Sequence, residues 1–256
     1  AISFSTQREY LNTPLLLMPR EPTLNNYINL LGDKRISIGY LTSLKILLLG
    51  LPINLFLTVS LAYGTSRKSY PGRRLILGAI LFTMLFNGGI LPLYLQMREL
   101  HLTNTIWSVI LASGINVFYF VLARNYFCSL PEALIESAQL DGAGEWRILF
   151  SIILPISKPI LATLTLFYMV DRWNEWYNAL IFIHENSIVP LQVVLRSIVM
   201  ESNSSSNTSS AQAAVRNFDM GSKMGAVMLT SLPIMCVFPF LQKHFAKGVM
   251  VGAIKA

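Results

Sequence analysis

The chain of 256 residues is 53% hydrophobic and only 13% charged, and its mean hydropathy is +0.52. An ordinary soluble domain carries about 25% charged residues, so this composition excludes one. The formal net charge is +7, but lysines and arginines stand at the ends of apolar blocks, where they act as topology signals and not as a nucleic-acid patch. We therefore expect an all-α, multi-pass membrane protein that sits in the lipid bilayer and has no nucleic-acid partner.

The first 40 residues are of mixed polarity and contain the helix-breaking residues Pro14, Pro19 and Pro22. We expect this segment, 1–40, to lie outside the cytoplasm, with a short helix at 27–31 on the membrane surface. Five spans with a cytoplasmic C-terminus put Ala1 outside. We therefore also expect a sixth span, N-terminal to Ala1, in the whole protein.

Five apolar blocks follow, each about 20 residues long, which is the length that crosses a bilayer as a helix. They cover residues 41–63, 75–97, 104–126, 159–183 and 224–240 and define a transmembrane domain at 41–256. The second block contains Asn87-Gly88-Gly89 and Pro92, so we expect that span to be bent or locally unwound.

Basic residues predict the orientation of these spans. Most of them fall on one side, which the positive-inside rule identifies as the cytoplasm: Arg67, Lys68, Arg73, Arg74, Arg124, Arg147, Lys158 and the lysines of a C-terminal tail at 241–256. Lys34, Arg35 and Lys45 fall on the opposite side. The loop at 184–222 is then extracytoplasmic, and its Ser/Asn/Thr-rich tract at 202–210 predicts a flexible linker.

The polar loop at 129–159 predicts two short helices joined by a glycine turn. Ser129 and Glu132 have the spacing of a capping box, and Gly142 is placed to end the first helix in a left-handed turn. Glu132, Glu136 and Gln139 share one face of that helix, with Leu130, Leu134 and Ala138 opposite. The second helix should run from Glu145 to Leu154 and stop at Pro155 and Pro159.

This loop resembles the EAA loop of ABC importer permeases. The resemblance rests on Glu136-Ser137-Ala138, Gly142, Ile152 and Leu154-Pro155, with Ser137 as a departure from the second position of the pattern. It implies that the loop docks on a separate ATPase subunit; the alternative is an ordinary helix–turn–helix on the membrane surface. The implied coupling residues are Glu132, Glu136, Ser137, Ala138, Asp141, Gly142 and Ala143.

The fourth block carries a second polar cluster. Asp171, Asn174, Glu175 and Asn178 are spaced i, i+3, i+4 and i+7, which predicts one polar helix face near mid-membrane. A charged side chain costs roughly 2.5–3.5 kcal/mol in the bilayer centre, so this face should meet a partner helix or a water-filled path.

Neighbouring aromatic rings could stack on a sugar while the amides and carboxylates bind its hydroxyls. The predicted substrate path is Asp171, Trp173, Asn174, Glu175, Trp176 and Asn178, together with Asn87 and Tyr119. The alternative is an interfacial aromatic belt with a structural ion pair between Asp171 and Arg172.

No nucleotide-binding P-loop and no catalytic motif occurs in the sequence, so energy must come from another subunit. We expect no cofactor on this chain, with ATP and Mg on partner ATPase subunits. We also expect no metal site, because His101, His184 and His244 are scattered, and two free thiols at Cys128 and Cys236.

Segments 247–255, 86–92 and 190–192 resemble the smaller partner of maltose-type permease pairs, in the branch that handles complex or acidic oligosaccharides. The resemblance implies alternating access in a prokaryotic cell membrane. It further implies a second homologous permease, two ATP-binding subunits, an extracytoplasmic solute-binding protein and an oligosaccharide substrate. Two other functions stay open: a membrane-embedded glycan-processing enzyme using Asp171 and Glu175, and a channel or structural subunit.

Overall fold

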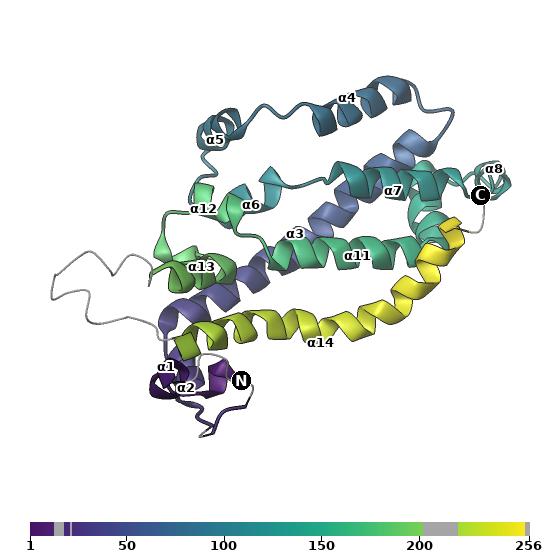
Figure 1. The fold of residues 1–256 in the computed structure, drawn as a ribbon. Helices are drawn as coiled ribbons and strands as arrows, with labels where there is room; N and C mark the ends of the chain where they lie inside the picture. The colour runs from purple at the N-terminus through teal and green to yellow at the C-terminus, as the bar shows by residue number, and fades with distance from the viewer. Residues whose placement is uncertain (13–17, 21, 202–219, 254–256) are drawn as a thin grey trace.

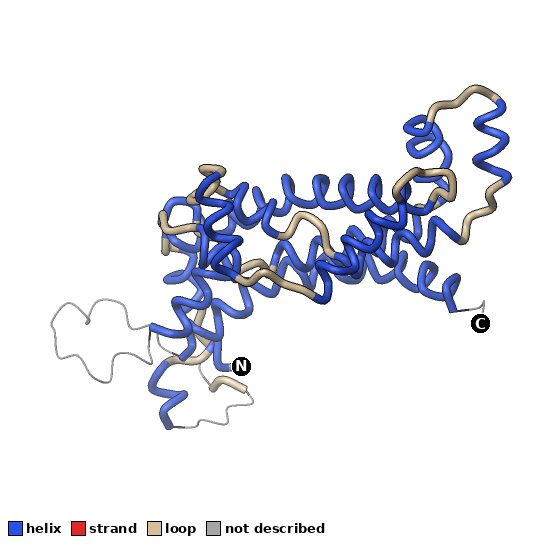
Figure 2. Tube along the Cα trace, turned by 90° about the horizontal axis from the view of Figure 1, so that it is seen from above, coloured by secondary structure: helices blue, strands red, loops and turns tan. Residues whose placement is uncertain are grey.

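The computed structural model describes residues 1–12, 18–20, 22–201 and 220–253, which form helices and loops without a strand (Figure 2). By length and composition, two of the described helices could cross a membrane, or up to five if each of three bent helix pairs is one span. The expected all-α membrane fold is thus confirmed. The helices are α1 Gln7–Asn12, α2 Asn25–Leu31, α3 Lys34–Ser66, α4 Arg73–Leu85, α5 Ile90–Glu99, α6 Ile106–Ala112, α7 Val117–Cys128, α8 Ala133–Leu140, α9 Glu145–Ile148, α10 Leu154–Ile156, α11 Lys158–Trp173, α12 Tyr177–Phe182, α13 Leu191–Glu201 and α14 Met220–Ala253.

The molecule is elongated, and its functional parts lie at different places along its length. Helices α3 and α14 run the length of the body, and α3 packs on α7 and α11 (Figure 1). Helix α8 lies at one end, where Figure 1 views it nearly end-on, and α2, α12 and α13 lie towards the other. The ends therefore match the predicted separation of loop 129–159 from the N-terminal segment and loop 184–222.

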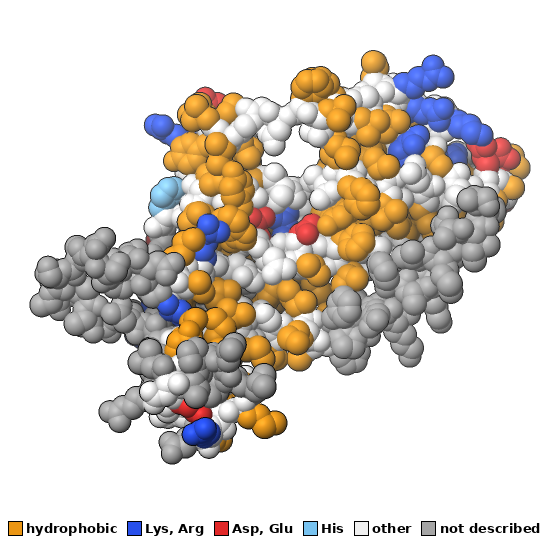
Figure 3. Space-filling model, viewed as in Figure 1, with side chains coloured by type: hydrophobic (Ala, Val, Ile, Leu, Met, Phe, Trp, Pro, Cys, Tyr) orange, Lys and Arg blue, Asp and Glu red, His pale blue; other side chains and the backbone are white. Residues whose placement is uncertain are grey.

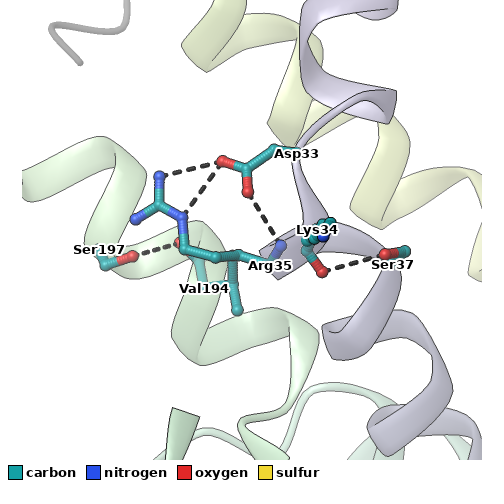
Figure 4. A network of polar contacts seen from close by, with 6 residues as sticks. All are labelled: Asp33, Lys34, Arg35, Ser37, Val194 and Ser197. Carbon is teal, nitrogen blue, oxygen red and sulfur yellow. Dashed lines mark hydrogen bonds and ion pairs between the residues drawn. The ribbon is translucent and has the colours of Figure 1, made fainter. Parts of the chain in front are cut away.

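Helix α3 starts seven residues before the predicted first span (34 against 41). The Asp33 carboxylate accepts a hydrogen bond from the Arg35 backbone N at 2.9 Å and caps the helix, while its other oxygen pairs with the Arg35 guanidinium at 3.1 Å (Figure 4). Beside this pair, α13 presents Ser197, whose hydroxyl donates to the Val194 carbonyl. The polar residues that suggested a loop are thus the capped first turn of the helix.

The second and third spans are both broken, the second as predicted and the third not. The expected bend in the second span lies between α4 and α5, which meet at 119°; Gly89 has φ +88°, and the Asn87 side chain accepts a hydrogen bond from its backbone N. The third span is also broken, by 54°, between α6 and α7. The sequence did not predict this break, because most residues around it are apolar. The Asn116 side-chain oxygen accepts hydrogen bonds from the backbone N of Phe118 and Tyr119, and this cap starts a new helix.

The fourth span is not the continuous helix that the sequence predicted, and the single polar face across 171–178 is wrong. Helix α11 ends at Trp173, and α12 begins at Tyr177. Asn174 closes α11, because its backbone and side-chain nitrogens both donate to the Val170 carbonyl. Glu175 supports the start of α12 by accepting from the Asn178 backbone N at 3.1 Å.

Loop 129–159 has the predicted helix–turn–helix form. Gly142 has φ +78°; its N–H bonds the Gln139 carbonyl, and the Ala143 N–H bonds that of Ala138, which is a Schellman motif. The predicted capping box is wrong, because the Ser129 hydroxyl donates back to the Tyr126 carbonyl and closes α7.

The packing of the loop also differs in detail. Ile135 and Ala138 are the buried residues of α8, whereas Leu134 is exposed. Pro155 does not stop the second helix: α9 continues through a π-helical turn, Leu149–Ile153, into α10, where the proline occupies the first turn and needs no N–H partner. The chain turns by 87° between this segment and α11.

The remaining predictions have mixed outcomes. The helix expected at 27–31 is confirmed as part of α2, its place at the membrane surface stays a prediction, and both cysteines are free and exposed. Loop 184–222 contains a helix, α13, that packs on α3 and α14. The predicted linker at 202–210 lies outside the described residues, and the predicted tail at 241–256 continues α14 as far as Ala253.

Candidate translocation cavity and coupling loop

A cavity of about 330 Å³ lies where the break between α6 and α7 faces the break between α11 and α12. In Figure 3, acidic and basic side chains meet in a hollow near the middle of the visible face, surrounded by apolar side chains. The lining residues of the cavity are Ser113, Ile115, Asn116, Tyr168, Asp171, Arg172, Asn174, Glu175, Trp176 and Tyr177.

Two carboxylates of this cavity are held in place by neighbouring donors. Asp171 accepts a hydrogen bond from the Tyr119 hydroxyl at 2.8 Å. Glu175 accepts from the backbone and side-chain nitrogens of Asn178, each at 3.1 Å, and from the Ser113 hydroxyl at 3.4 Å. Each carboxylate has about four lone-pair positions, so both keep acceptor capacity for the hydroxyls of a ligand.

Arg172 sits behind the cavity and is 3% exposed. Its Nε donates to the Asn54 amide oxygen at 2.9 Å, and its two Nη atoms donate to the carbonyls of Val109, Ile110 and Ser113 and to the Ser113 hydroxyl at 2.7–3.0 Å. These bonds use all five guanidinium N–H groups. The alternative ion pair with Asp171 is therefore wrong, because the two side chains bind different partners.

The guanidinium and Asn54 together close the C-terminus of α6. Asn54 donates from Nδ2 to the carbonyls of Ser113 and Gly114, at 3.1 and 2.6 Å. A positive charge at this position also complements the helix dipole. The approach is close, since a Cβ on Gly50 would lie 3.2 Å from the Arg172 Nε. Arg172 thus fixes the broken wall of the cavity to α3 and α11.

Six of the predicted path residues lie at the cavity, and two lie away from it. Asp171, Asn174, Glu175 and Trp176 line the cavity, and Tyr119 and Asn178 hold its carboxylates. Trp173 is elsewhere: it is 6% exposed and donates from Nε1 to the Thr230 carbonyl in α14. Asn87 lies in the α4–α5 break.

Sequence reasoning missed the lining residues Ser113, Asn116 and Tyr168 and the role of Arg172. One signal was present, because Gly114 and Asn116 interrupt an otherwise apolar block with residues that favour turns. The exposed Arg196 packs on the ring of Trp176, with its guanidinium carbon 4.1 Å from the ring centre. This contact is a cation–π interaction that orients the indole.

At the far end of the molecule, the turn of loop 129–159 is exposed. Of the predicted coupling residues, Glu132, Glu136, Ser137, Asp141 and Gly142 are exposed, Ala138 is buried and Ala143 is half-buried. Leu140, at the turn, is 89% exposed, so the end of α8 presents an apolar side chain on the surface. Figure 2 shows α8 crossing the direction of the long helices at this end.

Two polar contacts fasten the loop to the membrane helices. Glu145 accepts from the Tyr63 hydroxyl at 2.7 Å and from Gln139 Nε2 at 2.9 Å, which links α3, α8 and α9. Lys68 pairs with Glu132 at 2.8 Å, and this hydrogen bond lowers the pKa of the Glu132 carboxyl. These contacts connect the loop to the end of α3 and to the residues that follow it.

Comparison with known proteins supports a transport role. Residues 39–251 match the family described as "Binding-protein-dependent transport system inner membrane component". The chain is 37% identical over 254 residues to protein LplC of Bacillus subtilis (strain 168), covering 99% of this chain and 86% of LplC. It is 35% identical to YtcP of the same organism, a polygalacturonan/rhamnogalacturonan transport system permease protein, covering 100% of this chain and 90% of YtcP.

A solved structure agrees with these relatives. The chain superposes with a TM-score of 0.85 and 29% identity on a chain of a crystal structure of a bacterial ABC transporter involved in the import of the acidic polysaccharide alginate, covering 95% of this chain and 87% of that one. The chain belongs to the family of inner membrane permease components of binding-protein-dependent ABC transporters.

Proposed function

We propose that this chain is one of two permease subunits of an ATP-driven importer of oligosaccharides in a prokaryotic cell membrane. The observation that carries the proposal is the cavity between the two span breaks, which combines carboxylates, amides and an aromatic ring. Such a wall suits a sugar, because hydroxyls bind the polar groups and the C–H faces of the ring stack on Trp176. The polygalacturonan and alginate transporters among the similar proteins favour a complex or acidic oligosaccharide.

The exposed turn at Gly142 is the proposed docking point for the ATPase. Two ATPase subunits, which bind ATP and Mg, approach each other on nucleotide binding and move the coupling loops of both permeases. Glu145 transmits this movement to α3, and the Arg172 contacts transmit it to the cavity wall. An extracytoplasmic solute-binding protein delivers the sugar to the other end of the molecule. The movement of the coupling loops opens the cavity to the two sides of the membrane in turn.

The proposed function is tested with the complete complex reconstituted in vesicles, with ATP inside and labelled oligosaccharide plus binding protein outside. Glu175→Gln removes a cavity charge while keeping one acceptor oxygen. We expect about tenfold weaker uptake at low sugar concentration, the effect of losing ~1.4 kcal/mol of charge-assisted hydrogen bonding.

The matched control is Asn87→Ala, which changes a predicted path residue that lies outside the cavity. It should leave uptake near the wild-type value. Equal uptake by Glu175→Gln and wild type would contradict the assignment of this cavity. Uptake without ATP would favour a channel, and turnover of a glycan by this chain alone would favour an enzyme.

A further inference from the structure

A second cavity, of about 440 Å³, lies at the end of the molecule that carries loop 129–159. It is separate from the translocation cavity and is enclosed by the end of α3, the loop 67–72, the first turn of α4, and α9. Apolar side chains make up one part of its wall, from Leu61, Ile76 and Leu149. Ser60 and Arg67 contribute polar atoms to the same wall.

Two buried polar atoms of this cavity lack partners. Ser60 Oγ and Arg67 Nε are buried without a hydrogen bond, although leaving a buried polar group without a partner costs free energy. Glu145 also lines the cavity, but each of its oxygens already accepts a hydrogen bond, from Tyr63 and from Gln139. The cavity therefore offers an unused donor on a cation and an unused hydroxyl.

The surroundings of the cavity are strongly basic. Arg67 also lines a neighbouring cavity of about 170 Å³ together with Lys68 and Arg73, and Arg74 follows directly; Glu132 in that cavity pairs with Lys68, which leaves the three arginines in excess. Figure 3 shows basic side chains gathered over this end of the face, where α3 gives way to α4. This charge favours an anionic ligand.

The cavity also has the features of a lipid–water boundary. Trp146 and Tyr70 line it and are 60% and 46% exposed, and such aromatic residues gather at the headgroup level of a bilayer. Helix α4 leads away from the cavity and buries none of its residues, so its apolar side chains provide a surface for acyl chains. A ligand with an anionic head and apolar tails matches both halves of the site.

We propose that this cavity binds the headgroup of an anionic phospholipid from the leaflet on the side of loop 129–159. The lipid phosphate accepts from Arg67, a headgroup oxygen meets Ser60, and the acyl chains run along α4. The site includes Glu145 and Trp146 of α9, so the bound lipid supports the second helix of the coupling loop. This inference does not depend on the identity of the transported sugar.

The test measures phosphatidylglycerol bound to the assembled permease–ATPase complex in neutral detergent, by native mass spectrometry during lipid titration. Arg67→Gln removes the central charge. Gly64→Leu fills the cavity without changing charge, and its Cβ meets no atom within 4 Å, so the helix accepts it. Arg74→Gln is the matched control, because it removes a charge from the same basic segment without lining either cavity.

We expect Arg67→Gln and Gly64→Leu to weaken binding about fivefold or more, and Arg74→Gln to weaken it less than about twofold, since one basic contact to an anionic lipid is worth ~1 kcal/mol. Phosphatidylcholine should bind no better to wild type than to Arg67→Gln. Equal losses in Arg67→Gln and Arg74→Gln would show diffuse attraction and overturn the site. Unchanged binding in Gly64→Leu, or displacement of the lipid by inorganic phosphate alone, would overturn it as well.

Discussion

Replacement of Arg172 by lysine separates the effect of charge from the effect of hydrogen-bond geometry. The guanidinium donates five hydrogen bonds over 2.7–3.0 Å to acceptors on α3 and α6. A lysine ammonium keeps the charge but has three N–H groups on one atom, so at least two acceptors lose their donor. At ~1.5 kcal/mol for each bond to a charged group, the loss is about 3 kcal/mol.

The assay is thermal unfolding of the purified complex together with sugar uptake in vesicles. A loss of about 3 kcal/mol corresponds to a melting temperature lowered by ~6–12 °C for a chain of this size. Uptake should fall further than stability alone explains, because the wall formed by Ser113 and Asn116 is no longer fixed. Arg124→Lys is the control, since Arg124 makes one long contact, from Nε to the Thr65 carbonyl at 3.4 Å.

A double variant tests the mechanism more closely. Arg172 and Asn54 share one hydrogen bond and close the same helix end, so the effects of Arg172→Lys and Asn54→Leu should be less than additive. Strict additivity would show that the two side chains act independently. A melting temperature and uptake of Arg172→Lys equal to those of Arg124→Lys would refute the reasoning.

Two further predictions concern the coupling turn and the topology. Gly142→Val should lose the ATPase in a pull-down, because φ +78° strains a side-chain-bearing residue by ~1–2 kcal/mol or more. The control Gly144→Val, at a position with φ −71°, should keep the ATPase. Retention of full sugar-stimulated ATPase activity by Gly142→Val would contradict the coupling role. In a background without Cys128 and Cys236, single cysteines at Ser69 and Ser187 should react with an impermeant thiol reagent from opposite sides of the membrane, and labelling from the same side would contradict the topology.

Much of the fold could be predicted because the thickness of the bilayer sets the length of a spanning helix, so apolar blocks of that length identify the spans. The position of the turn in loop 129–159 was predictable for a local reason: only glycine adopts the left-handed conformation there without strain, and Gly142 does so. The break between α6 and α7 was not predictable from block length, because Ser113–Asn116 is short and its neighbours are apolar. The Ser113 carbonyl at that break accepts a hydrogen bond from Arg172, a residue more than 50 positions away in the sequence (172 against 113).

The candidate site was predicted in composition but not in shape. Residues 171–178 could form one continuous polar helix face or contain a helix break. Both arrangements place the same residue types near mid-membrane, so the sequence pattern does not distinguish the two. The structure distinguishes them through Asn174 and Glu175, which bond backbone atoms at the end of α11 and the start of α12. Trp173 shows the opposite error: an aromatic ring chosen for stacking on a sugar serves as a packing contact with α14.

The broken spans and the cavity have a common cause. A helix break inside a bilayer leaves backbone N–H and C=O groups without partners, and it is stable only where other parts of the protein or a water-filled cavity satisfy them. Here Arg172 and Asn54 satisfy the carbonyls of one break, and Asn174 and Glu175 satisfy groups of the other. Because Arg172, Asn174 and Glu175 also line the cavity, we expect a shift of α3 relative to α11 to change the break and the proposed ligand site together. Several of the polar groups that make the breaks tolerable are therefore the same groups that line the proposed sugar site.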